Sequence, residues 1–182
     1  MKLLIASDIH GSVYYLEKLI DRYNIEKPDK IILLGDYLYH GPRNDLPKDY
    51  NPKKAVELLN NLKEKIIGVR GNCDSEVDQM VLEFPIMADY NYLNIDGVDI
   101  YLTHGHIYNQ NNPIPGSKGI VLYGHTHVAS CETIEGITYI NPGSISIPKQ
   151  DSKHSYLVYE DKMFKWIDLI ENKVYKKISI WI

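Results

Sequence analysis

Apolar and polar residues follow two different patterns in the two halves of the chain. In the first half, short aliphatic runs at residues 2–6, 30–34 and 65–69 have the length and composition of buried strands. Residues 12–23 and 52–64, which lie between these runs, place apolar residues at helical spacing. This alternation of strand and helix predicts parallel βαβ units with right-handed crossovers.

The second half is predicted to consist of strands without intervening helices. They are expected at residues 98–103, 120–123, 130–134, 137–140, 156–159, 164–170 and 174–182. Glu135-Gly136 indicates a hairpin between two of them, and the last three are expected to be antiparallel. The two halves together predict an α/β fold with two β-sheets packed face to face and helices outside. We expect a single domain over residues 1–182.

Composition and charge exclude several classes of protein. The chain has 182 residues, 44% of them hydrophobic, so it can bury a substantial core without disulfides. Its net charge of −4 does not favour a broad nucleic-acid-binding face, although bound cations would reverse the charge locally. Cys73 and Cys131 do not form a secreted disulfide framework, so we expect a cytoplasmic protein. No apolar run approaches the roughly 18 residues that would span a membrane.

Metal-ligating residue types recur where the predicted strands end. Each of five aliphatic runs stops at a glycine-flanked polar residue, and the set comprises Asp8, His10, Asp36, Asn72, His104, His125 and His127. One aspartate or histidine in such a place is usually a cap, but the carboxyl ends of parallel strands line one crevice. Aspartate and histidine suit manganese, iron, zinc or cobalt. The sequence therefore predicts a metal cluster at this edge.

Six short motifs extend this prediction to a family. DIHG, GDYLYHGPRN, GNCD, THGH, GHTH and NPGS occur in this order. They resemble the motifs of the calcineurin-like metallophosphoesterases, and most of all those of the YfcE-type phosphodiesterase subgroup. The resemblance covers residues 2–159 and implies a four-layer αββα sandwich of two mixed sheets flanked by helices.

The resemblance also implies a ligand set for two divalent cations. The first cation would take Asp8, His10 and His127, the second would take Asn72, His104 and His125, and Asp36 would bridge them. In this family a hydroxide held by the two metals attacks phosphorus in line. Manganese is the expected metal, with iron, zinc, cobalt and nickel as alternatives, and a small phosphodiester is the expected substrate.

One position departs from the pattern of many relatives. They carry a histidine after the asparagine, where it is thought to protonate the leaving group, and this chain has Cys73 there. A thiol suits that role less well, so Cys73, the adjacent Asp74 and His106 are the candidate catalytic residues. His40 is an alternative acid, and His40 and Arg43 are candidates for binding phosphate oxygens. The NPGS motif at residues 141–144 is expected to support the site from behind.

Other functions remain open at this point. The small retromer subunit resembles this fold but is an interaction scaffold with a degraded site, whereas this chain keeps every ligand residue. A repair nuclease of this type would be longer and carry DNA-contacting parts, and a phosphomonoesterase is a further alternative. We expect no stable nucleic-acid partner and no membrane. The tyrosine-rich residues 88–93 and the apolar residues 178–182 are expected to lie in the sheet interior or to form an interface of a homo-oligomer.

Overall fold

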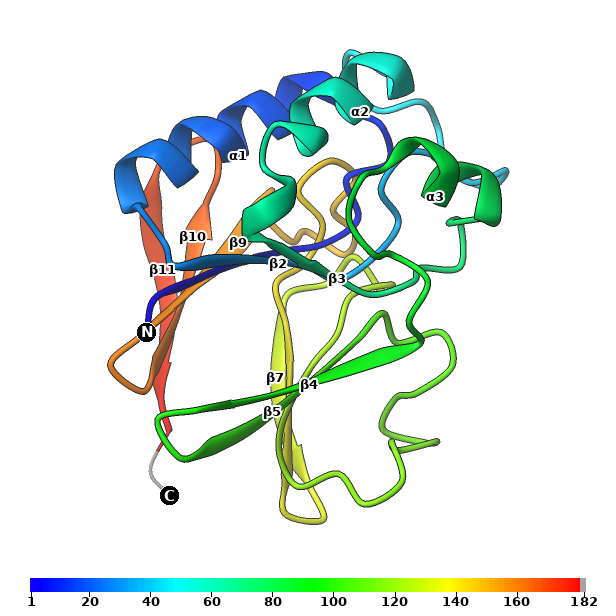
Figure 1. Ribbon diagram of the computed structural model, residues 1–182. Helices are drawn as coiled ribbons and strands as arrows, with labels where there is room; N and C mark the ends of the chain where they lie inside the picture. Colours follow the sequence, from blue (N-terminus) through cyan, green and yellow to red (C-terminus); the bar gives the residue numbers. More distant parts are fainter. Residues whose placement is uncertain (181–182) are drawn as a thin grey trace.

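Two mixed β-sheets form the framework of the protein (Figure 1). The structure is a computed structural model that describes residues 1–180. The six-stranded sheet has the order β11-β10-β9-β1-β2-β3 and the five-stranded sheet has the order β4-β5-β6-β8-β7. The first comprises β1 (Leu3–Ala6), β2 (Lys30–Leu33), β3 (Ile66–Gly68), β9 (Ser155–Glu160), β10 (Met163–Asp168) and β11 (Lys173–Ser179). The second comprises β4 (Tyr90–Ile95), β5 (Val98–Thr103), β6 (Gly119–Leu122), β7 (Ser130–Ile134) and β8 (Ile137–Asn141).

Strand directions confirm the two patterns predicted from the sequence. β1, β2 and β3 are mutually parallel, and β1 pairs with β2 from Leu3 opposite Lys30 to Ala6 opposite Leu33. β9, β10 and β11 continue this sheet in antiparallel order, as expected for the end of the chain. In the other sheet β5, β6 and β8 are parallel. The expected last strand extended to residue 182, but residues 181–182 lie outside the described part of the chain.

The helices pack on the outer face of the six-stranded sheet. α1 (Val13–Glu26), α2 (Pro52–Asn60) and α3 (Glu76–Val81) lie together above β2 and β3 in Figure 1, and a 3-10 turn, η1 (Lys63–Lys65), follows α2. α1 ends at Glu26, three residues beyond the predicted end, and is followed by Lys27 in a left-handed conformation. None of the helices described is long and apolar enough to cross a membrane.

Three clusters of buried side chains separate the layers. One lies between the helices and the six-stranded sheet and includes Leu16 and Val158. A second fills the space between the two sheets and includes Ile5, Leu102 and Trp166. The third is small, contains Val121, and lies on the outer face of the five-stranded sheet. Two face-to-face mixed sheets therefore agree with the predicted fold class.

The outer face of the five-stranded sheet differs in detail from the expected sandwich. In the described chain the segment 105–118 takes the place of a fourth, helical layer there. Gln110 of this segment donates a hydrogen bond to the Tyr123 hydroxyl at 2.9 Å, and Ile114 is buried. This segment is rich in asparagine, proline and glycine, which do not favour a helix.

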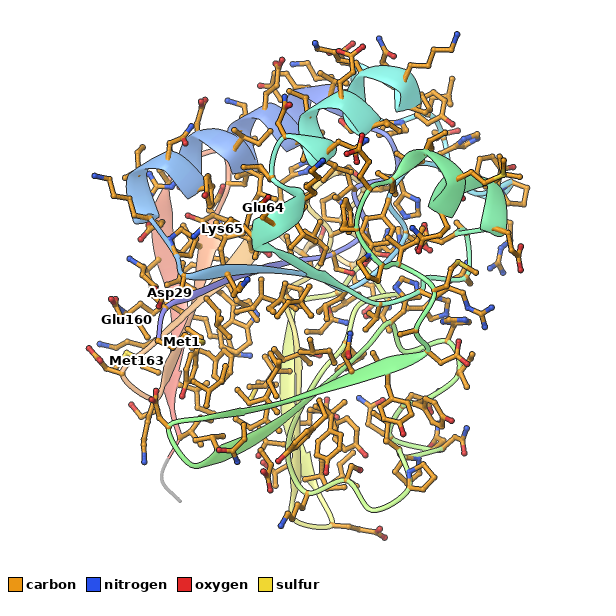
Figure 2. The ribbon with its side chains drawn as sticks, in the orientation of Figure 1. Met1, Asp29, Glu64, Lys65, Glu160 and Met163 are labelled. Carbon is orange, nitrogen blue, oxygen red and sulfur yellow. The ribbon has the colours of Figure 1, made fainter. Side chains whose placement is uncertain are left out.

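The amino ends of β1, β2 and β3 form a charged end of the molecule. Figure 2 labels Met1, Asp29, Glu64, Lys65, Glu160 and Met163 in this region. The Lys2 ammonium lies 2.7 Å from Glu26 and 3.8 Å from Glu160, and the Lys2 backbone N–H donates to Asp29 at 2.7 Å. Because these strands are parallel, their carboxyl ends all lie at the opposite edge, where the polar residues of the motifs follow.

Candidate functional site

Loops that follow β1, β2, β3, β5 and β6 bring the predicted polar residues to one edge of the sheets. Asp8, His10, Asp36, His125 and His127 all have positive φ angles, between 50° and 66°. Residues other than glycine adopt this left-handed region rarely, and such strain collects at functional sites. The loops after β1, β2 and β6 therefore turn sharply just after their strands, which directs these side chains into the space between the sheet ends.

Glycines permit the close approach of these loops. A side chain on Gly71 would overlap the Asp36 carboxylate, and a Cβ on Gly35 would lie 2.5 Å from the Gly71 nitrogen. A side chain on Gly124 would overlap the Ser7 hydroxyl, next to Asp8. These contacts explain why glycine flanks the polar residues of the motifs.

One end of the cluster consists of four buried residues, Asp8, His10, Asp36 and His127. Their ligand atoms all lie within 4.8 Å of one another. Nε2 of His127 is 3.2 Å from Asp8 Oδ1 and 3.2 Å from His10 Nε2. These residues come from the loops after β1, β2 and β6, so both sheets contribute to this end.

The other end of the cluster contains His104, Asn72 and His125. Nε2 of His104 lies 3.1 Å from Asn72 Oδ1, and the rings of His104 and His125 are 5.1 Å apart. Asp36 connects the two ends, because its Oδ2 lies 3.4 Å from His104 Nε2 and 3.6 Å from His10 Nε2. The structure thus brings together all seven residues that the sequence analysis assigned to the metals.

Hydrogen bonds to the backbone fix the orientation of three imidazoles. Nδ1 of His10, His104 and His127 lies 2.7 Å, 2.6 Å and 2.6 Å from the carbonyl oxygens of Tyr39, Leu34 and Ile147. In the neutral ring each Nδ1–H donates to its carbonyl, which leaves the Nε2 lone pair facing the cluster. Metal-binding histidines are held in this way.

Asp8 provides an independent test of whether a cation fits. Its Oδ1 is buried and has no hydrogen-bond partner, although His127 Nε2 lies 3.2 Å away. If His127 carries its proton on Nδ1, both atoms of this contact are acceptors. A cation between such atoms would satisfy them, so the donor set fits a divalent metal.

The charges within the cluster depend on one another. Burial alone would raise the pKa of Asp8, but His127, His104 and His10 outweigh it and hold that pKa below its usual range. Burial opposes a charge on His104, yet Asp36 and Asp8 raise the pKa of His104 to about 9. Without a cation, a proton on this imidazole balances the two carboxylates. A metal bound here would displace that proton.

The two candidate residues that follow Asn72, Cys73 and Asp74, have different surroundings. Cys73 is half-buried, its backbone N–H donates to Asp36 Oδ1 at 2.9 Å, and burial and Asp36 raise the pKa of its thiol to about 12. The Asp74 carboxylate points away from the cleft and accepts backbone N–H groups of Asp36, Tyr37 and Gly71 at 2.7–2.9 Å. Burial and the charge of Asp36 raise the pKa of Asp74 to about 7. Asp74 thereby connects the loops after β2 and β3.

The other candidates lie at different depths around the cluster. The His106 ring is 5.4 Å from His104 and 6.2 Å from His125, and its Nδ1 is buried without a hydrogen-bond partner. Burial and these two imidazoles lower the pKa of His106 to about 4. His40 packs between the rings of Tyr39 and Tyr50, at centroid distances of 4.8 Å and 5.2 Å.

A cleft of about 420 Å³ opens above the cluster. Its lining comprises Asp36, Gly41, Pro42, Arg43, Asn44, Asn72, Cys73, His125, Thr126, His127 and Lys149. Arg43 therefore lines the cleft, whereas His40, His106 and Asp74 are outside this lining. The sequence analysis missed Lys149, because a lysine in a loop carries no motif.

The NPGS segment lies behind the cluster. The hydroxyls of Ser144 and Ser146 each donate to the Asp8 carbonyl at 2.8 Å, and the Asn141 amide donates to the Gly124 carbonyl at 2.8 Å. These bonds hold the loop after β1 in its left-handed turn and support the loop after β6. The arrangement agrees with the supporting role expected for this motif.

Comparison with known proteins gives concordant results. Residues 1–162 match the model of the calcineurin-like phosphoesterase superfamily domain. The phosphodiesterase YfcE of Escherichia coli is 41% identical over 181 residues, covering 99% of this chain and 98% of the relative. A phosphodiesterase of Methanocaldococcus jannaschii is 28% identical and covers 79% of this chain and 83% of the relative.

Solved structures show the same relationship. The structure of YfcE, described as a phosphoesterase from E. coli, superposes with a TM-score of 0.96 at 41% identity and covers 100% of both chains. Vacuolar protein sorting 29 of Cryptosporidium parvum superposes with a TM-score of 0.65 at 19% identity, covering 98% of each chain. The second likeness shows the fold alone.

Proposed function

The chain belongs to the calcineurin-like phosphoesterase superfamily, and from this premise we propose that it is a phosphodiesterase that works with two divalent cations, manganese foremost. Iron, zinc, cobalt and nickel would suit the same ligands. The observation that carries the proposal is that five strand-end loops converge around Asp36. Imidazole Nε2 atoms there face the Asp36 carboxylate, and the Oδ1 of Asp8 has no hydrogen-bond partner.

Each part of the cluster has a proposed role. Asp8, His10 and His127 would hold one cation, Asn72, His104 and His125 would hold the other, and Asp36, whose Oδ2 faces both ends, would bind both. When bound, such cations neutralise charge on the phosphate oxygens and activate water for attack on phosphorus. The carbonyls that fix His10, His104 and His127 keep these ligands oriented, so little reorganisation is needed when the substrate enters.

Residues around the cluster would position the substrate and the ligands. Arg43 lines the cleft and can donate two hydrogen bonds to an anionic group of the substrate. Cys73 orients Asp36 through its backbone N–H, and Asp74 ties the loop of the bridging residue to the loop of Asn72. We assign His106 to the packing of His104 and His125, because its ring lies beside theirs and outside the cleft lining. His40 would shape the loop that carries Arg43.

Turnover of paired substrates tests this function. Metal-free protein is supplemented with manganese and assayed with bis(4-nitrophenyl) phosphate and with 4-nitrophenyl phosphate. We expect the diester to be hydrolysed faster than the monoester, and we expect chelation to abolish both activities. Hydrolysis of the monoester alone would contradict a diesterase, and no hydrolysis with any of the five metals would contradict the enzyme assignment.

Removal of the proposed bridging carboxylate tests the site. Asp36→Ala should lower turnover of the diester at least about 10³-fold, since several kcal/mol of transition-state stabilisation depend on the cations. Mass spectrometry of the metal content should show the loss of at least one cation. Asp21→Ala, an exposed aspartate on α1, is the matched control and should keep both properties. Wild-type turnover in Asp36→Ala would refute the bridging role.

A further inference from the structure

The cleft contains two basic side chains besides the proposed metal ligands. Arg43 and Lys149 both line it. Arg43 lies in the loop after β2, which also carries Asp36, and Lys149 lies in the loop between β8 and β9, which carries none of the seven cluster residues. Both are exposed, and within residues 1–180 no carboxylate lies at ion-pair distance from either. The cleft therefore has two basic side chains without an ion-pair partner, although the net charge of the chain is −4.

The two basic side chains, Lys149 and Arg43, lie at opposite ends of the cluster. Lys149 belongs to a loop fixed to His127, because its backbone N–H donates to the His127 carbonyl at 3.1 Å and the Ile147 carbonyl accepts from the His127 ring at 2.6 Å. Arg43 follows Gly41, whose Cα faces the Cys73 sulfur so closely that a Cβ would lie 3.2 Å from it. Lys149 is thus held at the end of His127 and Arg43 at the end of Asn72 and Cys73.

The rest of the lining suits a polar ligand. Asn44, Asn72 and Thr126 provide amide and hydroxyl groups, whereas Pro42 is the largest purely apolar residue in the lining. Binding of a lipid chain or an apolar ester group normally requires aromatic or aliphatic walls. At about 420 Å³ the cleft is much larger than a single phosphate group, so it has room for further parts of a substrate.

We propose that the preferred substrate is a small phosphodiester carrying a second anionic group, a phosphate or a carboxylate, and that Lys149 and Arg43 bind that group. This inference rests on the proposed diesterase function and specifies its substrate class. The cluster and its cations would neutralise the charge of the reacting phosphate. The two basic side chains are therefore available to bind another anion. Lys149, unlike the cluster residues, would determine specificity without contacting the reacting atoms.

A matched pair of substrates isolates the second anion. Thymidine 5′-(4-nitrophenyl phosphate) and its 3′-phosphorylated derivative share the reacting diester and the leaving group, and they differ by one phosphate. Exposed ion contacts contribute about 0.6 kcal/mol, so each of the two basic side chains should favour the phosphorylated substrate about threefold. For the wild type we expect a ratio of kcat/KM values of about ten, which should decrease as salt is added.

Variants assign the preference to the two side chains. Lys149→Met and Arg43→Met should each lower the ratio to about three, and the double variant should lower it to about one. Lys149→Arg keeps the charge and should retain the preference. Lys177→Met, on β11 and outside the cleft, makes the same change in net charge and should keep the ratio of about ten. A derivative with a carboxylate in place of the 3′-phosphate shows whether any anion suffices or phosphate is required.

Binding provides a readout that does not depend on turnover. Calorimetry should show that thymidine 3′,5′-bisphosphate binds the metal-loaded protein more tightly than thymidine 5′-monophosphate, and Lys149→Met should reduce this difference. Equal kcat/KM for the two diesters, or an unchanged ratio in Lys149→Met, would overturn the inference and leave the diesterase function intact. Failure to hydrolyse either diester would instead contradict the proposed function.

Discussion

The two sheets contribute different chemistry to the same cluster. Loops of the six-stranded sheet supply both carboxylates and the amide, Asp8, Asp36 and Asn72, whereas loops of the five-stranded sheet supply only imidazoles. The sheets also differ in their outer faces, since helices cover the first and the irregular segment 105–118 covers the second. Both proposed metal sites need ligands from both sheets, so the site can form only when the apolar layer between the sheets is packed.

Removing one imidazole ligand from either end of the cluster should cost the protein a different cation in each case. His127→Ala and His104→Ala should each lower diester turnover at least about 10³-fold, because each removes a ligand of a different cation. Each variant should lose about one metal equivalent by mass spectrometry. His154→Ala is the control, because His154 packs against Tyr15 at a centroid distance of 4.2 Å away from the cluster. Loss of both cations in either variant would show that the two sites are not separable.

Substitution of two buried valines allows the packing on the outer faces of the two sheets to be compared. Val158 lies under the helices and Val121 lies on the face covered by segment 105–118, and each is 2% exposed. Val158→Ala should lower the free energy of unfolding by about 2 kcal/mol, because closely packed helices leave a cavity that collapses poorly. Val121→Ala should lower it by only about 1 kcal/mol, since an irregular segment can relax around the missing methyl groups. Urea unfolding measures both, and equal losses would show that the two faces are packed equally well.

Elements with strong local patterns could be predicted, whereas weakly patterned ones could not. Parallel strands and the two long helices follow from aliphatic runs and helical spacing. β4 (Tyr90–Ile95) was not predicted as a strand. It lies at the edge of its sheet, and Tyr90 and Tyr92 remain 45% and 49% exposed, so its sequence lacks the aliphatic run that indicates a buried strand. α3 (Glu76–Val81) has only six residues and buries none of them, so it is too short for a helical pattern to stand out, and the reciprocal bonds of Ser75 and Asp78 cap it.

The cluster itself was foreseen more completely than its surroundings. Its members stand directly after strands, and strand order places them together. The supporting carbonyls of Tyr39, Leu34 and Ile147 carry no sequence signal, because any residue has a carbonyl. Asp74 and Cys73 illustrate the same limit, since adjacent residues point to opposite sides of the loop and only the folded backbone decides which faces the cleft.

The smallest expected effect concerns Cys73, on the six-stranded side of the cleft. General acid assistance is worth roughly 10²–10⁴-fold and matters for alcohol leaving groups of high pKa, whereas nitrophenolate leaves without a proton. Cys73 instead fills space beneath Gly41 and accepts a hydrogen bond from the Asn72 amide at 3.2 Å. Cys73→Ala should therefore lower turnover of alkyl and nitrophenyl diesters alike, by about threefold or less, through a slightly displaced Asn72. Cys73→Ser, which retains a hydrogen-bonding side chain there, should be closer to the wild type. A loss that grows steeply as the leaving group becomes poorer would identify Cys73 as the general acid.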